Sequence, residues 1–217
     1  KAQALPTLEE NWSHALKKAG VDAQKIKLTF NEPLGPKTTF GIGGPARVWA
    51  EPTDEKELTA VLKIAKKLQL PVFCLGRGSN LLVLDSGFDG LVIRLSGPHW
   101  QQIQWRKDHS AKAWCGVRLK VLCAEAAKRG LAGFEFMEGI PATLGGALHM
   151  NAGAYNAWTF DRVKQVAFLD AKGRLKKATP KDLKPGYRNV PGLKGSVVLW
   201  AVMAPAGDVG RIRASAR

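Results

Sequence analysis

The chain has 217 residues, of which 45% are hydrophobic and 24% are charged, and its formal net charge at pH 7 is +15. The length suits one large domain or two small ones, and the composition is that of a globular protein that can bury its own core. The three cysteines are odd in number and lack CxxC spacing, so the sequence argues against zinc and a disulfide framework and favours a reducing compartment. No apolar run reaches membrane-spanning length, and the first twenty residues do not read as a signal peptide.

The first third of the chain reads as two helices and several strands. Thr7 and Glu10 have the spacing of a capping box before an amphipathic segment, which predicts a helix over residues 7–19. Asp54 is placed to cap a second helix that runs to about Leu68. Strands are expected at residues 46–52, 71–75, 81–84 and 90–95.

The remainder of the chain mixes strands with one clear helix. Residues 100–117 are typical of a hairpin whose turn lies at 108–110, and residues 118–129 show helical spacing of apolar side chains. The Gly-rich stretch 130–155 is too irregular for a single helix. Two more strands are expected at 163–173 and 196–204, and the closing segment 207–217 is compatible with the first turns of a helix.

Two Gly-rich loops follow apolar sequence, GRGSNL at 76–81 and GIPATLGG at 139–146. Glycine permits positive φ and close approach of a ligand to the backbone, so each loop could direct several N–H groups at a diphosphate. Neither loop is a standard nucleotide fingerprint, since Leu81 stands where the Rossmann pattern needs its third glycine. Taken singly, each loop is more often a structural turn than a ligand site.

The charge of +15 favours anionic partners, but it does not specify one. The lysines are scattered, and the aromatic residues are not interleaved with them as in an RNA-binding motif. We therefore interpret the charge as a solvated basic surface in preference to a nucleic-acid interface. Steeply salt-dependent retention on DNA would favour the alternative.

Four segments resemble the UDP-N-acetylenolpyruvoylglucosamine reductases in order and spacing: 38–46 (TTFGIGGPA), 75–95, 133–155 and 186–190 (GYRNV). The resemblance runs from about Leu28 to Ala204. It implies an α+β fold of two FAD-binding subdomains, the type found in p-cresol methylhydroxylase and vanillyl-alcohol oxidase, and not a Rossmann fold. The expected organisation is a helical extension (1–27), subdomain 1 (28–97), subdomain 2 (98–205) and the start of a linker (206–217).

The resemblance also implies roles for individual residues. Arg188 matches the family's active-site arginine beside the flavin, and Tyr187 next to it is expected to bind substrate. The structural alternative for Arg188 is a surface salt bridge at the start of a strand. The residues expected to bind FAD are Gly76, Arg77, Gly78, Ser79, Asn80, Leu81, Gly139, Ile140, Pro141, Thr143, Gly145, Gly146, Asn151, Gly153 and Arg188. Tyr155 belongs to the same matching segment. His149 is expected to be a hydrogen-bonded histidine and not a flavin attachment site.

Some positions depart from the family pattern. Gly41 and Arg77 stand where a basic residue and a glycine are usual, and Ala142 replaces a glycine. Arg77 is therefore a candidate for an additional contact with the diphosphate. The family's third domain, with its proton-donor serine and a later glutamate, has no counterpart before Arg217. We accordingly expect the chain to be a truncated FAD-binding portion that is inactive by itself.

The function implied is that of a bacterial cytoplasmic flavoenzyme of peptidoglycan precursor synthesis. It would use noncovalent FAD, with NADPH as hydride donor, to reduce a small-molecule UDP-sugar, without a metal or a membrane partner. The sequence does not indicate an oligomeric state. The alternative is a stand-alone FAD-binding or regulatory module without catalysis, which a genuine stop codon after Arg217 would favour.

Overall fold

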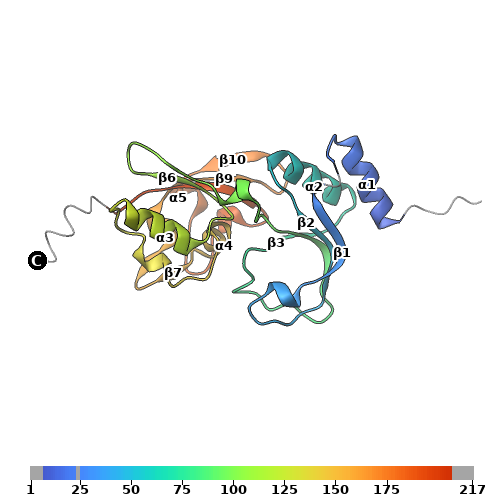
Figure 1. Ribbon diagram of the computed structural model, residues 1–217, viewed down its shortest axis with the longest axis horizontal. Coiled ribbons are helices and arrows are strands. Elements are labelled where there is room, and N and C mark those ends of the chain that lie inside the picture. The colour runs from blue at the N-terminus through green and yellow to red at the C-terminus, as the bar shows by residue number, and fades with distance from the viewer. Residues whose placement is uncertain (1–6, 23–24, 207–217) are drawn as a thin grey trace, which may run out of the picture. The chain divides into compact units, whose positions relative to one another are not determined.

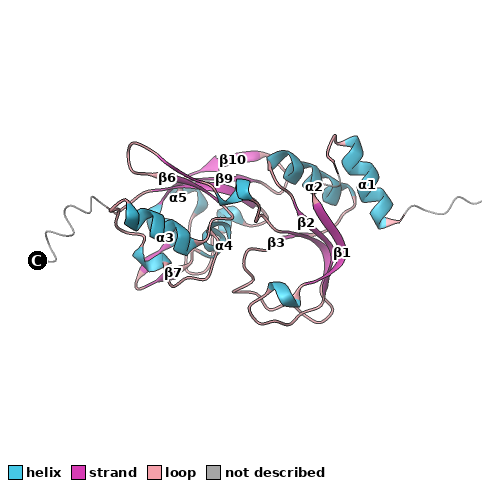
Figure 2. Cartoon of the chain, in the orientation of Figure 1, coloured by secondary structure: helices cyan, strands magenta, loops and turns pink. Residues whose placement is uncertain are grey.

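The computed structural model describes residues 7–22 and 25–206, and the chain divides into two compact units, 1–97 and 98–217. Each unit is built on its own β-sheet with helices packed beside it (Figure 1). The mixture of helices and strands in both units confirms the expected α+β class (Figure 2). The predicted helical turns after residue 206 lie outside the described residues.

The first unit contains a mixed four-stranded sheet in the order β1-β2-β4-β3. Strand β1 pairs antiparallel with β2, while β4 runs parallel to both of its neighbours. The strands are β1 (Lys27–Pro33), β2 (Pro45–Glu51), β3 (Val72–Cys74) and β4 (Phe88–Ile93). Strand β1 is not among the strands expected above, and β4 begins and ends two residues before the predicted strand at 90–95.

Two capped helices pack against each other in the first unit. In α1 (Leu8–Lys18), Thr7 and Glu10 form the predicted capping box, and Trp12 and Leu16 are fully buried. In α2 (Glu55–Lys67), the Asp54 side chain accepts a hydrogen bond from the Glu57 N–H at 2.8 Å. Both helices therefore begin where their cap residues predict, because each side chain satisfies a backbone donor that the helix leaves unpaired.

Residues 81–84 were predicted to be a strand, and this prediction is wrong. They form part of the loop between β3 and β4 (Val72–Cys74 and Phe88–Ile93). Leu81 and Val83 pack against the core cluster, whereas Leu82 and Leu84 are 64% and 72% exposed. The alternation of burial resembles that of a strand. Within the described residues, however, the Leu84 carbonyl accepts a hydrogen bond from the N–H of Gly44 at 2.9 Å and from that of Gly87 at 2.9 Å, and no strand ladder is formed.

The second unit contains an antiparallel five-stranded sheet in the order β10-β9-β11-β6-β5. The predicted hairpin is present, with its turn closed by the Ser110 side chain and N–H, which both donate to the Asp108 carboxylate. The predicted strands at 163–173 and 196–204 are also present in shorter form. The strands are β5 (Ile103–Trp105), β6 (Ala111–Trp114), β9 (Val163–Leu169), β10 (Leu175–Ala178) and β11 (Val197–Met203).

Three helices and a small hairpin complete the second unit. Helix α3 is the one predicted from apolar spacing, and it buries Leu119, Leu122 and Ala126. The helices are α3 (Leu119–Lys128), α4 (Leu144–Met150) and α5 (Pro180–Leu183), and the hairpin strands are β7 (Gly153–Ala154) and β8 (Ala157–Trp158). Short 3-10 turns lie at 35–37, 98–101, 135–137, 159–162 and 191–193.

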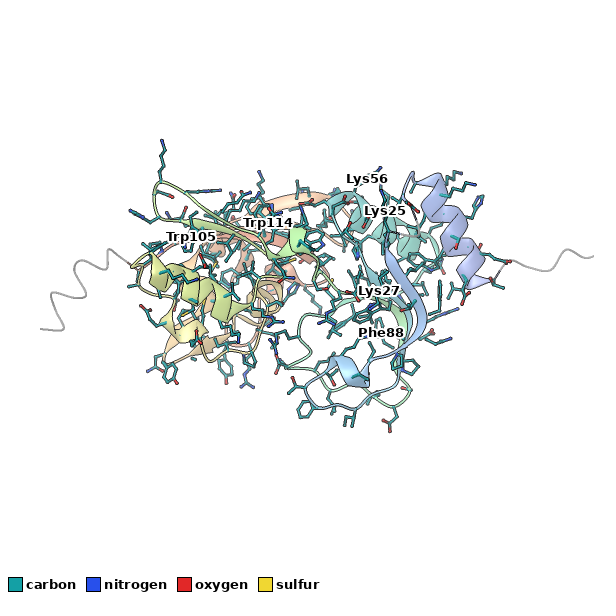
Figure 3. The ribbon with its side chains drawn as sticks, in the orientation of Figure 1. Lys25, Lys27, Lys56, Phe88, Trp105 and Trp114 are labelled. Carbon is teal, nitrogen blue, oxygen red and sulfur yellow. The ribbon has the colours of Figure 1, made fainter. Side chains whose placement is uncertain are left out.

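Several lysine and arginine side chains lie over tryptophan rings. Lys112 places its ammonium 4.2 Å from the Trp114 ring centroid and 4.5 Å from that of Trp200. Trp105, labelled with Trp114 in Figure 3, lies on the neighbouring strand. The Arg129 guanidinium lies 4.8 Å from the Trp105 ring centroid. These cations cover aromatic surface of the protein itself. No helix within residues 7–22 and 25–206 is long and apolar enough to cross a membrane.

Candidate functional site

The first glycine loop connects β3 to β4 and presents a run of backbone N–H groups. Those of Arg77, Gly78 and Asn80 donate to no backbone carbonyl within the described residues. Gly78 adopts φ +64, and a Cβ there would lie 2.4 Å from the Lys37 carbonyl oxygen. The loop therefore needs glycine for its own close packing. Neighbouring backbone N–H groups that donate to no backbone carbonyl are compatible with an anion-binding nest.

A second loop of the first unit, residues 38–44, is joined to the first one. Thr39 N–H donates to the Gly78 carbonyl at 3.0 Å. At Gly43 a Cβ would lie 2.4 Å from that of Val83, so the two loops meet without room for a side chain. Phe40 and Ile42 are exposed beside this junction, as are Leu82 and Leu84. The polar backbone of the loop thus borders exposed apolar side chains, which suits a ligand with a charged centre and a flat apolar ring.

The second glycine loop ends at the start of α4, where the structure leaves open space. A Cβ at Gly146 would meet only the Thr143 hydroxyl oxygen, 3.7 Å away, and at Gly139 it would meet nothing within 4 Å. The Gly146 N–H donates to no acceptor among the described residues, and the Thr143 side chain makes no capping hydrogen bond. Because packing does not require glycine at residue 146, the open backbone fits close approach of a ligand such as the diphosphate of FAD.

Gly145 precedes Gly146 in the chain, but its surroundings are closely packed. Its N–H donates to the Cys115 carbonyl at 2.8 Å, and a Cβ would lie 3.1 Å from that of Cys115. Ile140 is half-buried and Pro141 is exposed in the loop before the helix. Of the two adjacent glycines, Gly145 therefore serves packing inside the unit, whereas Gly146 faces open space.

His149 lies within hydrogen-bonding distance of backbone groups, as the sequence suggested, and Glu135 also has a backbone partner. The His149 Nδ1 lies 2.9 Å from the Gly145 carbonyl oxygen and its Nε2 lies 3.3 Å from that of Ser196. Glu135 accepts a hydrogen bond from the Gly133 N–H at 2.7 Å. Both nitrogens of the histidine ring thus face backbone carbonyl groups of the protein.

Asn151 and Gly153 follow α4 and are used within the unit. Asn151 is buried in the left-handed conformation with φ +40, and both polar atoms of its side chain contact backbone groups. At Gly153 a Cβ would lie 2.4 Å from the Trp158 ring across the small hairpin. Tyr155 is 90% exposed at the tip of that hairpin. The close packing of the hairpin requires glycine at residue 153, whatever else binds there.

Tyr187 and Arg188 are the two central residues of a tight turn. Gly186 N–H donates to the Asn189 carbonyl at 2.8 Å, and Arg188 has φ +50. The Tyr187 ring is 72% exposed and packs edge-on against Trp158, with ring centroids 5.7 Å apart. The Arg188 guanidinium lies 5.4 Å from the Tyr187 ring centroid, and it forms no salt bridge within the described residues.

Trp158 is the contact that the sequence did not predict. No motif marks it, because its partner Tyr187 lies 29 positions further along the chain and on another element. The second unit brings Asn151, Trp158 and the turn carrying Arg188 into one part of the fold, through the hydrogen bonds and ring contact described above. The described residues hold no cluster of ligands suited to a metal ion.

The cysteine thiols next to these elements are poor nucleophiles. Burial raises the pKa of Cys74 to about 12. Burial, together with the neighbouring Glu138 carboxylate, also raises the pKa of Cys123. Cys115 is buried, and none of the three cysteines forms a disulfide within the described residues. Because the thiolate is the reactive species, thiol chemistry at the site is disfavoured near neutral pH.

Comparisons with known proteins agree on a flavin-binding family. A family model described as "FAD binding domain" matches residues 46–179. UDP-N-acetylenolpyruvoylglucosamine reductase of Caulobacter vibrioides is 42% identical over 163 residues, which make up 75% of this chain and 54% of that protein. The reductase of the same name from Clostridioides difficile is 38% identical over 164 residues, 76% of this chain and 53% of that protein.

Solved structures give the same result for the fold. The crystal structure of UDP-N-acetylenolpyruvylglucosamine reductase from Thermus caldophilus matches with a TM-score of 0.70 and 31% identity, covering 88% of this chain and 67% of that one. A Physcomitrella patens BBE-like 1 variant matches with a TM-score of 0.66 at 18% identity, which concerns the fold alone. The chain spans a little over half the length of the curated relatives described above.

Proposed function

Because the chain belongs to the FAD binding domain family, and within it to the UDP-N-acetylenolpyruvoylglucosamine reductases, we propose that it is the flavin-binding part of such an enzyme. The whole enzyme would reduce UDP-N-acetylglucosamine enolpyruvate to UDP-N-acetylmuramate in peptidoglycan precursor synthesis, with NADPH as hydride donor. The observation that carries this proposal is the open space at Gly146 beside a free backbone N–H and an uncapped Thr143.

Each unit contains candidate residues for binding FAD. Residues 76–81 would direct backbone N–H groups at the diphosphate, with Arg77 as an exposed cation beside them. Gly139, Ile140, Pro141, Thr143 and the start of α4 would contact the flavin and the diphosphate. We propose that residues 28–97 and 98–205 act as the two FAD-binding subdomains. Binding would be noncovalent, which is supported by the engagement of both His149 ring nitrogens with carbonyl groups.

In this proposal FAD, when bound, supplies the redox chemistry, and the protein supplies orientation and charge. Arg188 would act on the substrate. Its guanidinium is exposed and forms no ion pair within the described residues, so it is free to pair with the substrate carboxylate. Fixed in place, it would stabilise the negative charge that develops as the double bond of the substrate is reduced. Tyr187, exposed on the same turn, would contact the substrate beside it.

Protonation of the substrate requires a group that we do not find among these residues. We propose that the proton donor is supplied by a part of the enzyme beyond these 217 residues, and that the chain alone binds FAD without turnover. The three free thiols fit a reducing bacterial cytoplasm. A stand-alone flavin-binding module is the second candidate, since flavin binding and not catalysis is what the described loops support.

The first test is the visible absorption spectrum of the purified chain, recorded before and after denaturation. A flavin spectrum whose chromophore is released on denaturation is expected. A chromophore that stays with the polypeptide would contradict noncovalent binding. A colourless chain that takes up no added FAD would overturn the assignment of both glycine loops. Turnover of the enolpyruvyl substrate by the chain alone would contradict the need for a further proton donor.

A further inference from the structure

The turn that carries Arg188 adopts a conformation that arginine does not favour. Arg188 has φ +50, and a Cβ in the left-handed region is crowded by the backbone. Such conformations persist only when surrounding contacts fix them, and they are concentrated at functional sites. Some neighbouring group must therefore hold this turn in place.

Of the two backbone hydrogen bonds that close the turn, one is short and the other is long. Gly186 N–H donates to the Asn189 carbonyl at 2.8 Å, but the return bond, from Asn189 N–H to the Gly186 carbonyl, is 3.5 Å long. The Gly186 carbonyl has a shorter partner in the side chain of Asn151, whose Nδ2 donates to it at 3.2 Å. Asn151 thus completes the closure of a turn that lies 35 positions away in the sequence.

The amide oxygen of the Asn151 side chain is also hydrogen-bonded. Its Oδ1 accepts a hydrogen bond from the Phe160 N–H at 3.1 Å. The residue is buried, and its own backbone is left-handed with φ +40, a conformation that asparagine tolerates better than most residues. The position therefore needs a short side chain with one donor and one acceptor at its tip, and asparagine meets all of these requirements.

A second contact supports the same turn from the side. The Tyr187 ring meets the Trp158 ring edge-on at 5.7 Å, and the Arg188 guanidinium lies 5.4 Å from the Tyr187 ring centroid. The backbone of the turn is thus fixed by Asn151, and the side chains are supported by Trp158.

We propose that Asn151 is a positioning residue for Arg188: its amide, by bonding the Gly186 carbonyl, fixes the turn that presents the guanidinium. This differs from the direct contact with FAD that the sequence suggests for Asn151. The inference rests on the proposed function, in which Arg188 acts on the substrate. In this role Asn151 acts through the turn, because both polar atoms of its side chain bond backbone groups.

The decisive variant is Asn151→Asp, made in the full-length enzyme. Aspartate keeps the acceptor for Phe160 and tolerates the left-handed backbone, but it replaces the donor to Gly186 by an oxygen that repels the carbonyl. We expect kcat to fall about tenfold, equivalent to about 1.4 kcal/mol, with a smaller change in KM and an unchanged flavin content. Should this variant fail to fold, Asn151→Gly removes the same donor without backbone strain.

A double-mutant cycle separates positioning from a general structural role. In an Arg188→Ala background, Asn151→Asp should have little further effect on kcat, because the group that it positions is gone. Ser196→Ala serves as the matched control, since it also removes a buried side-chain hydrogen bond to a backbone carbonyl, at Leu193, but leaves the turn alone. Effects of Asn151→Asp and Arg188→Ala that simply multiply would overturn the inference.

Amide hydrogen exchange gives a readout that does not depend on activity. We expect the Gly186 N–H to exchange about tenfold faster in Asn151→Asp, while the Leu183 N–H, which donates to Thr179, keeps its rate. Unchanged exchange at Gly186 would overturn the inference even if kcat fell. If Arg188→Ala leaves turnover unchanged, the catalytic assignment fails and the inference with it. Exchange at Gly186 then shows whether Asn151 nevertheless holds the turn.

Discussion

Replacing Gly146 by alanine should make the protein more stable and its flavin binding weaker. The position lies in α4 (Leu144–Met150) with an ordinary φ, and a Cβ would meet only the Thr143 hydroxyl oxygen at 3.7 Å. Alanine is favoured over glycine in helices by about 0.5–1 kcal/mol. For a chain of this size that corresponds to a rise in Tm of about 1–4 °C in the absence of FAD.

The same methyl group would occupy the space through which we propose that the FAD diphosphate reaches the Gly146 N–H. A loss of about tenfold in affinity corresponds to about 1.4 kcal/mol. At a free FAD concentration of about 100 times the wild-type Kd, bound ligand adds about 2.7 kcal/mol to stability, and a tenfold weaker site adds about half of that. The variant should thus start from a higher Tm and gain about half as much on addition of FAD.

The assay is a thermal unfolding series with and without FAD, accompanied by titration of flavin fluorescence. Gly145→Ala is the matched control, because its Cβ would lie 3.1 Å from that of Cys115. Such overpacking typically costs about 1–3 kcal/mol of stability, so Gly145→Ala should lower the Tm of the protein without ligand. An unchanged FAD affinity in Gly146→Ala would refute the assignment of the start of α4 to the diphosphate.

Three further outcomes are expected from the described contacts. Gly78→Ala should lower the free energy of unfolding by about 2 kcal/mol or more, since φ +64 is strained for alanine and the new Cβ would clash with the Lys37 carbonyl; an unchanged urea midpoint would contradict this. Leu16→Ala should lower the free energy of unfolding by about 2–5 kcal/mol because Leu16 is fully buried. A loss as small as that of a surface substitution would show that α1 does not stabilise the fold. The Arg174 and Lys172 N–H groups and the Arg174 side chain lower the pKa of Asp170 to about 2, so its contribution to stability is present above about pH 4 and is lost as the pH falls towards 2. Asp170→Asn should make the free energy of unfolding less dependent on pH between about pH 4 and 2. The same pH dependence in the variant and the wild type would contradict this role of Asp170.

Local signals in the sequence predicted those parts of the fold that local chemistry determines. The helices that begin after Thr7 and Asp54 were predicted because each cap is read within four residues. The turn at Asp108–Ser110 was predicted because it is also closed by residues close together in the sequence, with the Ser110 N–H donating to the Asp108 carboxylate. The α+β FAD-binding fold of the p-cresol methylhydroxylase and vanillyl-alcohol oxidase type, and the resemblance to the reductases, are confirmed by the comparisons.

Contacts between distant segments were beyond the reach of the sequence. Residues 81–84 alternate in burial like a strand, but a strand also needs a partner along its length, and sequence periodicity cannot supply that information. The glycines at residues 78, 146 and 153 look equivalent in the sequence. Only the structure shows that Gly78 and Gly153 are required by close packing while Gly146 faces open space. The roles proposed for these residues in binding FAD stay predictions.

The unreactive cysteines make the protein suitable for single-site labelling. Cys74, with its pKa of about 12, and the buried Cys115 should be nearly inert towards maleimides near neutral pH, and Cys123 should react slowly. A cysteine introduced at the exposed Leu84 or Leu175 would then be the fastest-reacting thiol in its unit. A pair of dyes at these two positions would report, by energy transfer, whether FAD changes the spacing of the two units.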